Sequence, residues 1–104
     1  EPSSAIKARV NKARAIQGKR FSGMKIFSNS QMAHKEIRKF CTLTKEAEGL
    51  LKMAINELGF SARAYDKILK ASRTIADLAG SEEILVEYVS EAIQYRSLDR
   101  QLWG

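Results

Sequence analysis

Arg63 is the residue of this chain whose type and position most suggest chemistry. In "FSARAYDKI", residues 60–68, Ser61 is a typical N-cap and the apolar residues behind it recur at helical spacing. Arg63 therefore falls in the first turn of a predicted helix, where unpaired N–H groups disfavour a cation by about 0.3–1 kcal/mol. A guanidinium there can instead join those N–H groups in binding an anion such as phosphate.

A second interpretation of Arg63 needs no ligand. An exposed arginine can pair with Asp66 or Asp77 of its own helix, which is worth a few tenths of a kcal/mol. At 100° per residue, four side chains lie nearly opposite the apolar stripe of this helix: Arg63, Lys67, Lys70 and Thr74. Arg63 is therefore expected to point away from its own core, toward water or a neighbouring body.

Other catalytic and metal-binding patterns are missing from the sequence. The chain has one His and one Cys, too few for a structural zinc site. His34 and Cys41 are seven residues apart, about 10 Å along a helix, which is too far for a thiolate and its base. "GKR" at residues 18–20 lacks the first Gly and the final Ser or Thr of a phosphate loop. We expect a buried structural Cys41, a surface His34, no metal site and no enzyme activity from this chain alone.

Positive charge is concentrated in the N-terminal part of the chain. Residues 1–40 contain ten Lys or Arg against two Glu, a net charge of +8, whereas the remaining residues contain eight basic and ten acidic side chains, a net charge of −2. Any attraction for DNA or another polyanion therefore belongs mainly to the N-terminal half. The residues that could form a polyanion or partner surface are Lys7, Arg9, Lys12, Arg14, Lys67 and Lys70. A solvated basic face and a scaffold that docks another protein remain alternatives.

Helical periodicity and turn residues divide the chain into five helices. The first is expected to start after Ser3 or Ser4, to turn Ile6, Val10 and Ala13 inward, and to end near Gln17 at Gly18. A packed loop should follow over residues 18–31, with Phe21, Met24, Ile26 and Phe27 as its apolar members. The remaining helices are predicted near residues 33–41, 45–58, 62–79 and from 86 to at least 95, with Thr44 as a cap, Leu58 in the core stripe and Gly59 and Gly80 as stops.

These elements predict an all-α fold, a compact bundle of four main helices plus one short helix. A chain of 104 residues is expected to form a single helical domain over residues 1–104. No apolar run is long enough to cross a bilayer, and no signal-peptide pattern precedes the first helix. With a single cysteine, nothing favours an oxidising compartment. The expectation is a cytoplasmic protein without membrane contact.

A helix-turn-helix reading of residues 44–79 is the alternative with a different function. The outward stripe of Arg63, Lys67 and Lys70 suits DNA phosphates. It has no Asn or Gln to read bases, and Asp66 and Asp77 dilute its charge. This hypothesis, an autonomous basic DNA-binding module, ranks second.

Several stretches taken in order resemble one family. "SARAY" at residues 61–65, "RTIADL" at 73–78 and "YRSLDR" at 95–100 are similar to the C-terminal helical domain of magnesium-chelatase-related AAA+ ATPases of the ComM/YifB type. "SSAIKARVNKARAIQ" at residues 3–17 and "SNSQM" at 28–32 resemble the lead-in helix and loop of the same family. The resemblance therefore covers essentially the whole chain.

The resemblance implies a lid-like C-terminal fragment of a larger protein. Family members have a Lon-protease-like domain, then a AAA+ core whose phosphate loop binds ATP and Mg²⁺, then this helical lid. Carried over by position, Arg63 corresponds to the sensor 2 arginine, which approaches the terminal phosphate in its own subunit or across a subunit interface. The implied partners are the AAA+ core of the same chain, neighbouring subunits of a homo-oligomeric ring, and DNA.

Two further implications of the resemblance stay open. The implied activity of the full-length protein is DNA branch migration by a helicase during recombination or transformation, with metal insertion into a porphyrin as the alternative inheritance. Arg96 and Arg100, four residues apart, suit packing on the ATPase core as well as DNA contact.

Overall fold

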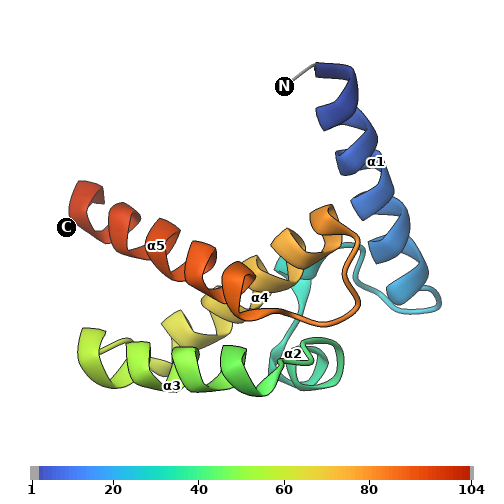
Figure 1. Ribbon diagram of the computed structural model, residues 1–104. Coiled ribbons are helices and arrows are strands. Elements are labelled where there is room, and N and C mark those ends of the chain that lie inside the picture. Colours follow the sequence, from blue (N-terminus) through green and yellow to red (C-terminus); the bar gives the residue numbers. More distant parts are fainter. Residues whose placement is uncertain (1–2, 104) are drawn as a thin grey trace.

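The computed structural model describes the main chain of residues 3–103 and the side chains of residues 3–96. Its elements, in chain order, are α1 (Ser3–Arg20), the 3-10 turn η1 (Asn29–Gln31), α2 (His34–Phe40), α3 (Lys45–Leu58), α4 (Ala62–Ala79) and α5 (Val86–Trp103), as Figure 1 shows. No strand occurs in the described part of the chain, where the sole sheet-like feature is an isolated bridge between Leu43 and Ile84. The predicted all-α fold of four long helices and one short helix is confirmed.

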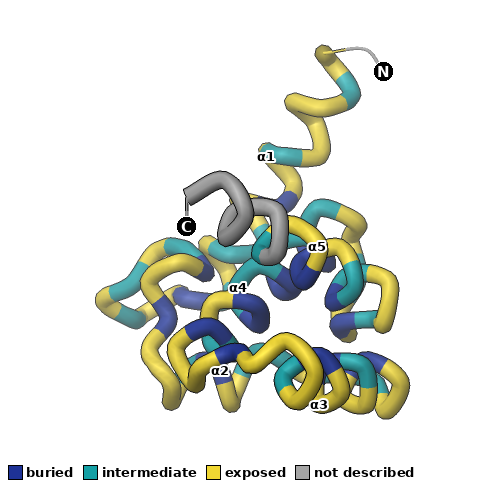
Figure 2. The backbone as a smooth tube through the Cα atoms, turned by 90° about the vertical axis from the view of Figure 1, so that its left-hand side faces the viewer, coloured by how far each residue is buried: buried dark blue, intermediate teal, exposed yellow. Residues whose placement is uncertain are grey.

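α4 is the central element of the fold. It packs against α5, α1, η1 and α2, and α5 in turn packs against α3. Buried residues gather where α3, α4 and α5 meet, whereas the N-terminal part of α1 projects from the body as an exposed helix (Figure 2). Among the described residues, no helix has the length and apolar character that a membrane span requires. The packing therefore leaves α4 in contact with nearly every other segment.

Capping residues fix the ends of α3 and α4 as the sequence predicts. The hydroxyl oxygen of Thr44 accepts a hydrogen bond from the Ala47 N–H at 3.2 Å, and Ser61 Oγ accepts one from the Ala64 N–H at 3.2 Å. At the other ends, Gly59 and Gly80 adopt φ values of 69° and 75°, a left-handed conformation that favours glycine. The start of α4, and so the position of Arg63 in its first turn, follows directly from these local signals.

The predicted end of α1 is wrong. The helix continues through Gly18 to Arg20, because the Arg20 side chain is held by Asp77 on α4 and this contact outweighs the cost of about 1 kcal/mol for a helical glycine. Ile6, predicted to face the core, is 44% exposed, since it lies on the projecting part of α1. Ala13 is the residue of α1 that is buried, as predicted.

Two other predicted core residues are exposed. Leu58 is the last residue of α3 and is 46% exposed, because the chain turns at Gly59 and buries Phe60 in its place. Phe27 is 76% exposed, although Phe21 in the same loop is buried as predicted. The loop also contains η1, which composition alone did not indicate.

The N-cap of α4 generates the first prediction. Replacing Ser61 by Ala removes the acceptor for the Ala64 N–H, so the free energy of unfolding should fall by about 1 kcal/mol. Urea denaturation followed by circular dichroism measures the change. Ser22→Ala, at an exposed loop serine, is the matched control and should change stability by less than about 0.5 kcal/mol. Equal stability of the Ser61→Ala and unmodified chains would contradict the assigned cap.

Candidate anion site and a buried arginine cluster

α4 carries polar groups at both of its ends. Arg63 lies in its first turn and Asp77 in its last turn, so their Cα atoms are separated by about 21 Å along the helix axis. Helical periodicity puts both residues on nearly the same side of the helix. Arg63 is exposed, whereas Asp77 is buried.

Arg63 borders a hollow of about 420 Å³ between the outer side of α4 and the segment that leads into α2. The residues that line it are Met32, Ala33, His34, Ile37, Arg63, Asp66, Lys67 and Lys70. The predicted outward orientation of Arg63 is confirmed, because Arg63 and Lys67 are exposed. Neither forms a hydrogen bond or an ion pair with another described residue. Two cations therefore face the same hollow without an acidic partner.

Neither of the two acidic residues that the sequence suggested as partners pairs with Arg63. Asp66 lies 3.6 Å from the Nδ1 atom of His34, and Asp77 is buried at the far end of α4. Lys70, the third cation of the hollow, donates from Nζ to the main-chain oxygen of Ser30 at 3.3 Å. The intrahelical pairing that would have explained Arg63 without a ligand is absent among the described residues.

The N-terminus of α4 adds main-chain donors beside Arg63. The Ser61 hydroxyl satisfies the Ala64 N–H, and the Ser61 carbonyl accepts from the Tyr65 N–H at 2.9 Å. The N–H groups of Ala62 and Arg63 have no intrahelical acceptor, as is usual in the first turn. These donors, the helix dipole and the guanidinium all favour an anion at this end of α4.

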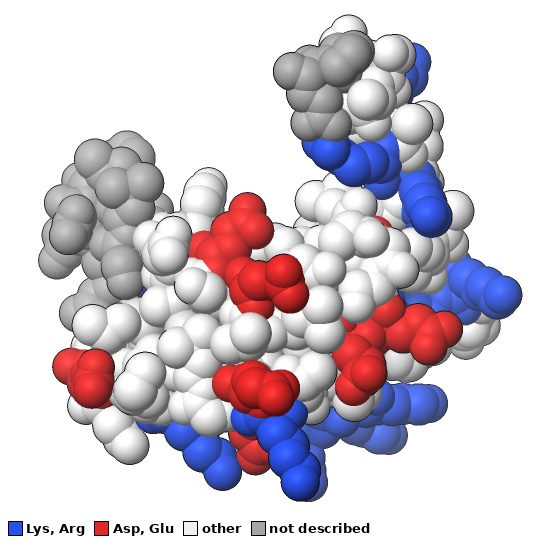
Figure 3. Space-filling model, in the orientation of Figure 1, with Lys and Arg blue, Asp and Glu red and all other residues white. Residues whose placement is uncertain are grey.

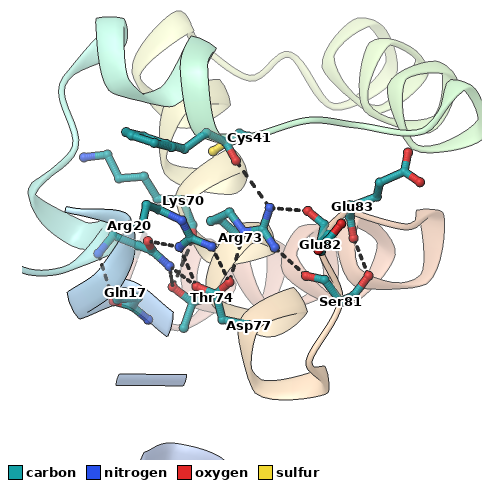
Figure 4. A network of polar contacts seen from close by, with 12 residues as sticks. Gln17, Arg20, Cys41, Lys70, Arg73, Thr74, Asp77, Ser81, Glu82 and Glu83 are labelled. Carbon is teal, nitrogen blue, oxygen red and sulfur yellow. Dashed lines mark hydrogen bonds and ion pairs between the residues drawn. The ribbon is translucent and has the colours of Figure 1, made fainter. Parts of the chain in front are cut away.

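At the other end of α4, Asp77 is the centre of a buried polar cluster (Figure 4). Its carboxylate accepts two hydrogen bonds from Arg20, at 2.7 and 2.8 Å, one from Arg73 Nε at 3.2 Å and one from Asn29 Nδ2 at 2.8 Å. Asp77 is 1% exposed and Arg73 is 2% exposed. One carboxylate thus binds two guanidinium groups, which come from α1 and from α4 itself.

Arg73 connects this cluster to the ends of two helices. Its Nη atoms donate to the main-chain oxygens of Phe40 at 3.3 Å, Glu82 at 2.8 Å and Ser81 at 2.7 Å. Phe40 ends α2, whereas Ser81 and Glu82 lie in the connection after α4, so the guanidinium meets one carbonyl at the negative end of a helix dipole and two carbonyls of a turn. Burial lowers the pKa of Arg73 from its ordinary value, and the charge of Asp77 opposes that change.

A second hollow, of about 430 Å³, lies beside this cluster and is also lined by Arg20, Lys39 and Arg73. Here the guanidinium groups already donate to a carboxylate, an amide oxygen and three main-chain oxygens. An additional anion would have to displace these bonds. The hollow at Arg63, whose cation has no partner, is therefore the better candidate for an anion site.

The burial of Asp77 corrects its predicted place on an exposed stripe. Helical periodicity puts Asp77 and Thr74 near the outward side of α4, but α1 and η1 pack over that part of the helix. Thr74 is half-buried, and its hydroxyl accepts a hydrogen bond from Asn29 Nδ2 at 3.1 Å. The outward side of α4 is consequently covered over its C-terminal half and open at Arg63 and Lys67.

The predicted polyanion residues do not form one surface. Lys7, Arg9, Lys12 and Arg14 are exposed on α1, and Figure 3 shows basic side chains along this helix and acidic ones over α5 and the turn before it. α1 crosses the C-terminal end of α4, where Lys12 Nζ lies 3.5 Å from the position that a Cβ atom on Gly80 would take. Lys67 lies about 20 Å from that end. The α1 cations are thus separate from those of the hollow.

The helix-turn-helix hypothesis requires α3 and α4 to form a pair that packs mainly against each other, and they do not. α3 and α4 each pack closely on α5 rather than along each other.

Of the two arginines of the last helix, Arg96 is half-buried, and the side chain of Arg100 lies outside the described residues. Within residues 3–96, no three His, Cys, Asp or Glu side chains are grouped closely enough to hold a metal ion.

His34 and Cys41 are turned toward different partners. His34 is exposed beside Asp66, whereas the half-buried Cys41 donates from Sγ to the Leu69 main-chain oxygen at 3.8 Å. Burial raises the pKa of Cys41 to about 11, although the positive charge of Arg73 lowers it in part. A thiol with such a pKa is a poor nucleophile near neutral pH, so the pair does not form a catalytic dyad.

Removing the charge of Asp77 should destabilise the fold severely. Asp77→Asn keeps the side-chain shape but leaves two buried guanidinium groups without an anion, so we expect a loss of about 3–5 kcal/mol in unfolding free energy. Asp66→Asn, which removes the same charge at a partly exposed site, should cost less than about 1 kcal/mol. Guanidinium chloride unfolding compares the two. Similar losses in both variants would contradict the central role of Asp77.

The raised pKa of Cys41 predicts slow thiol labelling. Since the folded pKa of about 11 lies above the ordinary value of 9.0, the thiolate population should be lower than in the unfolded chain by about 100-fold at pH 7 and about 50-fold at pH 9. The rate of labelling of the folded chain by a thiol-specific disulfide reagent should therefore still rise between pH 9 and 10. In urea, the unfolded chain should be labelled faster than the folded chain at each of these pH values. His34→Ala should leave the rate unchanged. A rate that levels off below pH 9, or that depends on His34, would refute this assignment.

Comparisons with known proteins agree with this architecture. Residues 1–96 match a family model described as magnesium chelatase, subunit ChlI C-terminal. Competence protein ComM of Haemophilus influenzae is 41% identical over 102 residues, which are 98% of this chain and 19% of that protein. The uncharacterized protein YifB of Escherichia coli is 39% identical, and that of Salmonella typhimurium 34%, over the same shares of chain and protein.

The chain spans about a fifth of the length of these curated relatives. The family match includes all of α1 to α4, and with them the open hollow at Arg63 and the cluster around Asp77. By this match and by its similarity to the three relatives, the chain belongs to the family of magnesium chelatase subunit ChlI C-terminal domains.

Proposed function

We propose that this chain is the helical lid of a magnesium-chelatase-related AAA+ ATPase, and that Arg63 acts as its sensor 2 arginine. In this proposal the full-length protein binds ATP and Mg²⁺ through a phosphate loop in a AAA+ core domain. The lid closes over the bound nucleotide and brings the guanidinium of Arg63 to the terminal phosphate. Negative charge that develops on that phosphate during hydrolysis is then stabilised by a fixed cation.

The observation that supports this proposal is the unpaired state of Arg63 at a helix N-terminus. Arg63 is exposed, forms no ion pair or hydrogen bond with another described residue, and borders a hollow with Lys67. The dipole of α4 makes this position unfavourable for a cation. A bound phosphate would reverse the cost, since the guanidinium and the helix N–H groups would both donate to it.

The wider role follows from family membership and is likewise a proposal. The lid would pack against the AAA+ core of its own chain and against neighbouring subunits of a homo-oligomeric ring. Closure and opening of such a lid would convert hydrolysis into rigid-body motion within the ring. Similarity to the ComM type favours a motor that acts on DNA, and we propose branch migration as its activity.

Replacing Arg63 tests the proposed role. In the full-length protein, Arg63→Ala should lower the rate of ATP turnover by about 100-fold, because it removes a donor that stabilises charge in the transition state. Arg63→Lys should retain part of the activity, since it keeps the charge but loses the planar fork. Lys45→Ala is a matched control, because Lys45 is also an exposed cation at the start of a capped helix. Its turnover should equal that of the unmodified protein.

Two results would overturn the proposal. One is undiminished hydrolysis by Arg63→Ala in a protein that still forms its oligomer. The other is a full-length sequence without a nucleotide-binding motif. Titration of the 104-residue chain with duplex and branched DNA at two salt concentrations tests the rival helix-turn-helix module. Tight binding that weakens steeply with salt would favour the rival function.

A further inference from the structure

α1 packs on the rest of the molecule mainly through its C-terminal half. Most side chains from Ser3 to Lys12 are exposed, and this part of the helix projects from the body (Figures 1 and 2). Lys12 lies beside Gly80, and the first fully buried residue is Ala13; burial recurs beyond the helix end at Phe21. α1 is therefore a helix that is packed at its C-terminal end and projects at its N-terminal end.

The firmest polar contact at the held end is made by Arg20. Its Nη1 and Nη2 atoms donate in parallel to the two carboxylate oxygens of Asp77, and Nη1 also donates to the Asn29 side-chain oxygen at 2.9 Å. A two-bond pair between planar groups fixes direction as well as distance. Its guanidinium carbon also lies 5.9 Å from the centre of the Phe21 ring. Gln17, one turn earlier, accepts from the Asn29 N–H at 3.1 Å and holds the loop in place.

The partner of Arg20 belongs to the helix that carries Arg63. Asp77 is in the last turn of α4 and Arg63 is in the first, about 21 Å apart on one continuous helix. α4 is one continuous helix whose buried apolar residues belong to the core and which packs against α5, so it moves as a rigid element. A change in the direction of α1 would therefore change the position of Arg63 relative to α1 and to whatever is joined to α1.

We propose that the Arg20–Asp77 pair fixes the direction of α1 relative to α4, and that Arg20 is thereby a positioning residue for Arg63. Whatever is joined to or packed on the projecting part of α1 then moves together with the anion site. The role of the pair in fixing the direction of α1 is argued from the contacts of Arg20 and does not depend on the lid function. Its effect on catalysis rests on the proposed lid function.

This role of Arg20 can be separated from a general role in folding. If Arg20 is removed, Asp77 keeps its bonds to Arg73 and Asn29, so no buried charge is left unpaired. Ala13 and Phe21 also remain in place as apolar anchors. Arg20→Met retains the apolar length of the side chain and should therefore leave the domain folded, with α1 free to change direction.

The first measurement concerns the direction of α1. Spin labels are placed on Lys7→Cys in α1 and Lys67→Cys in α4 of the 104-residue chain, with Cys41→Ser to remove the native thiol. Double electron–electron resonance should give one narrow distance distribution. Adding Arg20→Met should broaden the distribution or split it, while circular dichroism remains that of a folded helical protein. Lys19→Met, the loss of a neighbouring exposed charge on α1, should leave the distribution narrow.

A distribution that stays as narrow in Arg20→Met as in Lys19→Met would overturn the proposal. If Arg20→Met fails to fold, Arg20→Lys provides the second variant, since it keeps the charge but cannot make two parallel bonds to the carboxylate. It should also broaden the distribution. An unchanged distribution in a folded Arg20→Lys protein would overturn the proposal as well.

The second measurement concerns catalysis by the full-length protein. Arg20→Met should lower kcat for ATP turnover by about tenfold with a smaller change in KM, because Arg63 is displaced rather than removed. Lys19→Met should have no effect. If Arg63→Ala leaves turnover unchanged, the lid function fails but the distance measurement still decides the role of Arg20. If Arg63→Ala is impaired and Arg20→Met is not, the positioning of Arg63 by Arg20 is refuted.

Discussion

The Asp77 carboxylate, shared between two guanidinium groups, determines how α1 and the loop after it lie on the helical core. Taking three charged groups out of water costs several kcal/mol each unless every donor finds an acceptor. Here the bonds to Arg20, Arg73 and Asn29 satisfy the carboxylate. The cluster still holds one more positive than negative charge. The main-chain oxygens of Phe40, at the negative end of the α2 dipole, and of Ser81, in the turn after α4, offset this excess by accepting hydrogen bonds from Arg73.

These bonds also determine which segments meet. They join the end of α1, the η1 turn, the end of α2 and the connection between α4 and α5 to a single turn of α4. An apolar cluster can tolerate small rearrangements, whereas a bidentate ion pair accepts only one geometry. The apolar core of α3, α4 and α5 supplies burial, and the cluster specifies how α1 and the loop lie on it.

Local signals predicted most of the helices, and long-range contacts account for the errors. Thr44, Ser61, Gly59 and Gly80 mark the bounds of α3 and α4 because capping depends on neighbours within a few residues. The exposure of Arg63 also followed from periodicity. The burial of Asp77 did not, since it requires α1 and η1, whose sequences lie about 48 to 57 residues away. The Arg73–Asp77 spacing of four was the available signal, but alone it also fits an exposed pair.

Arg20 and Arg73 differ from Arg63 in the number of acceptors that their guanidinium groups find within the chain, and this difference bears on function. At one end of α4, each guanidinium donates to several acceptors within the chain. At the other end, a guanidinium of the same chemistry has none among the described residues and faces the positive end of its own helix. Stability alone favours losing that charge, since a neutral residue in the first turn avoids the repulsion. An arginine at this position is explained if its acceptor is an anion supplied from outside the chain, as proposed for the lid. In the proposed arrangement, the cluster at the opposite end of α4 fixes α1 relative to that arginine.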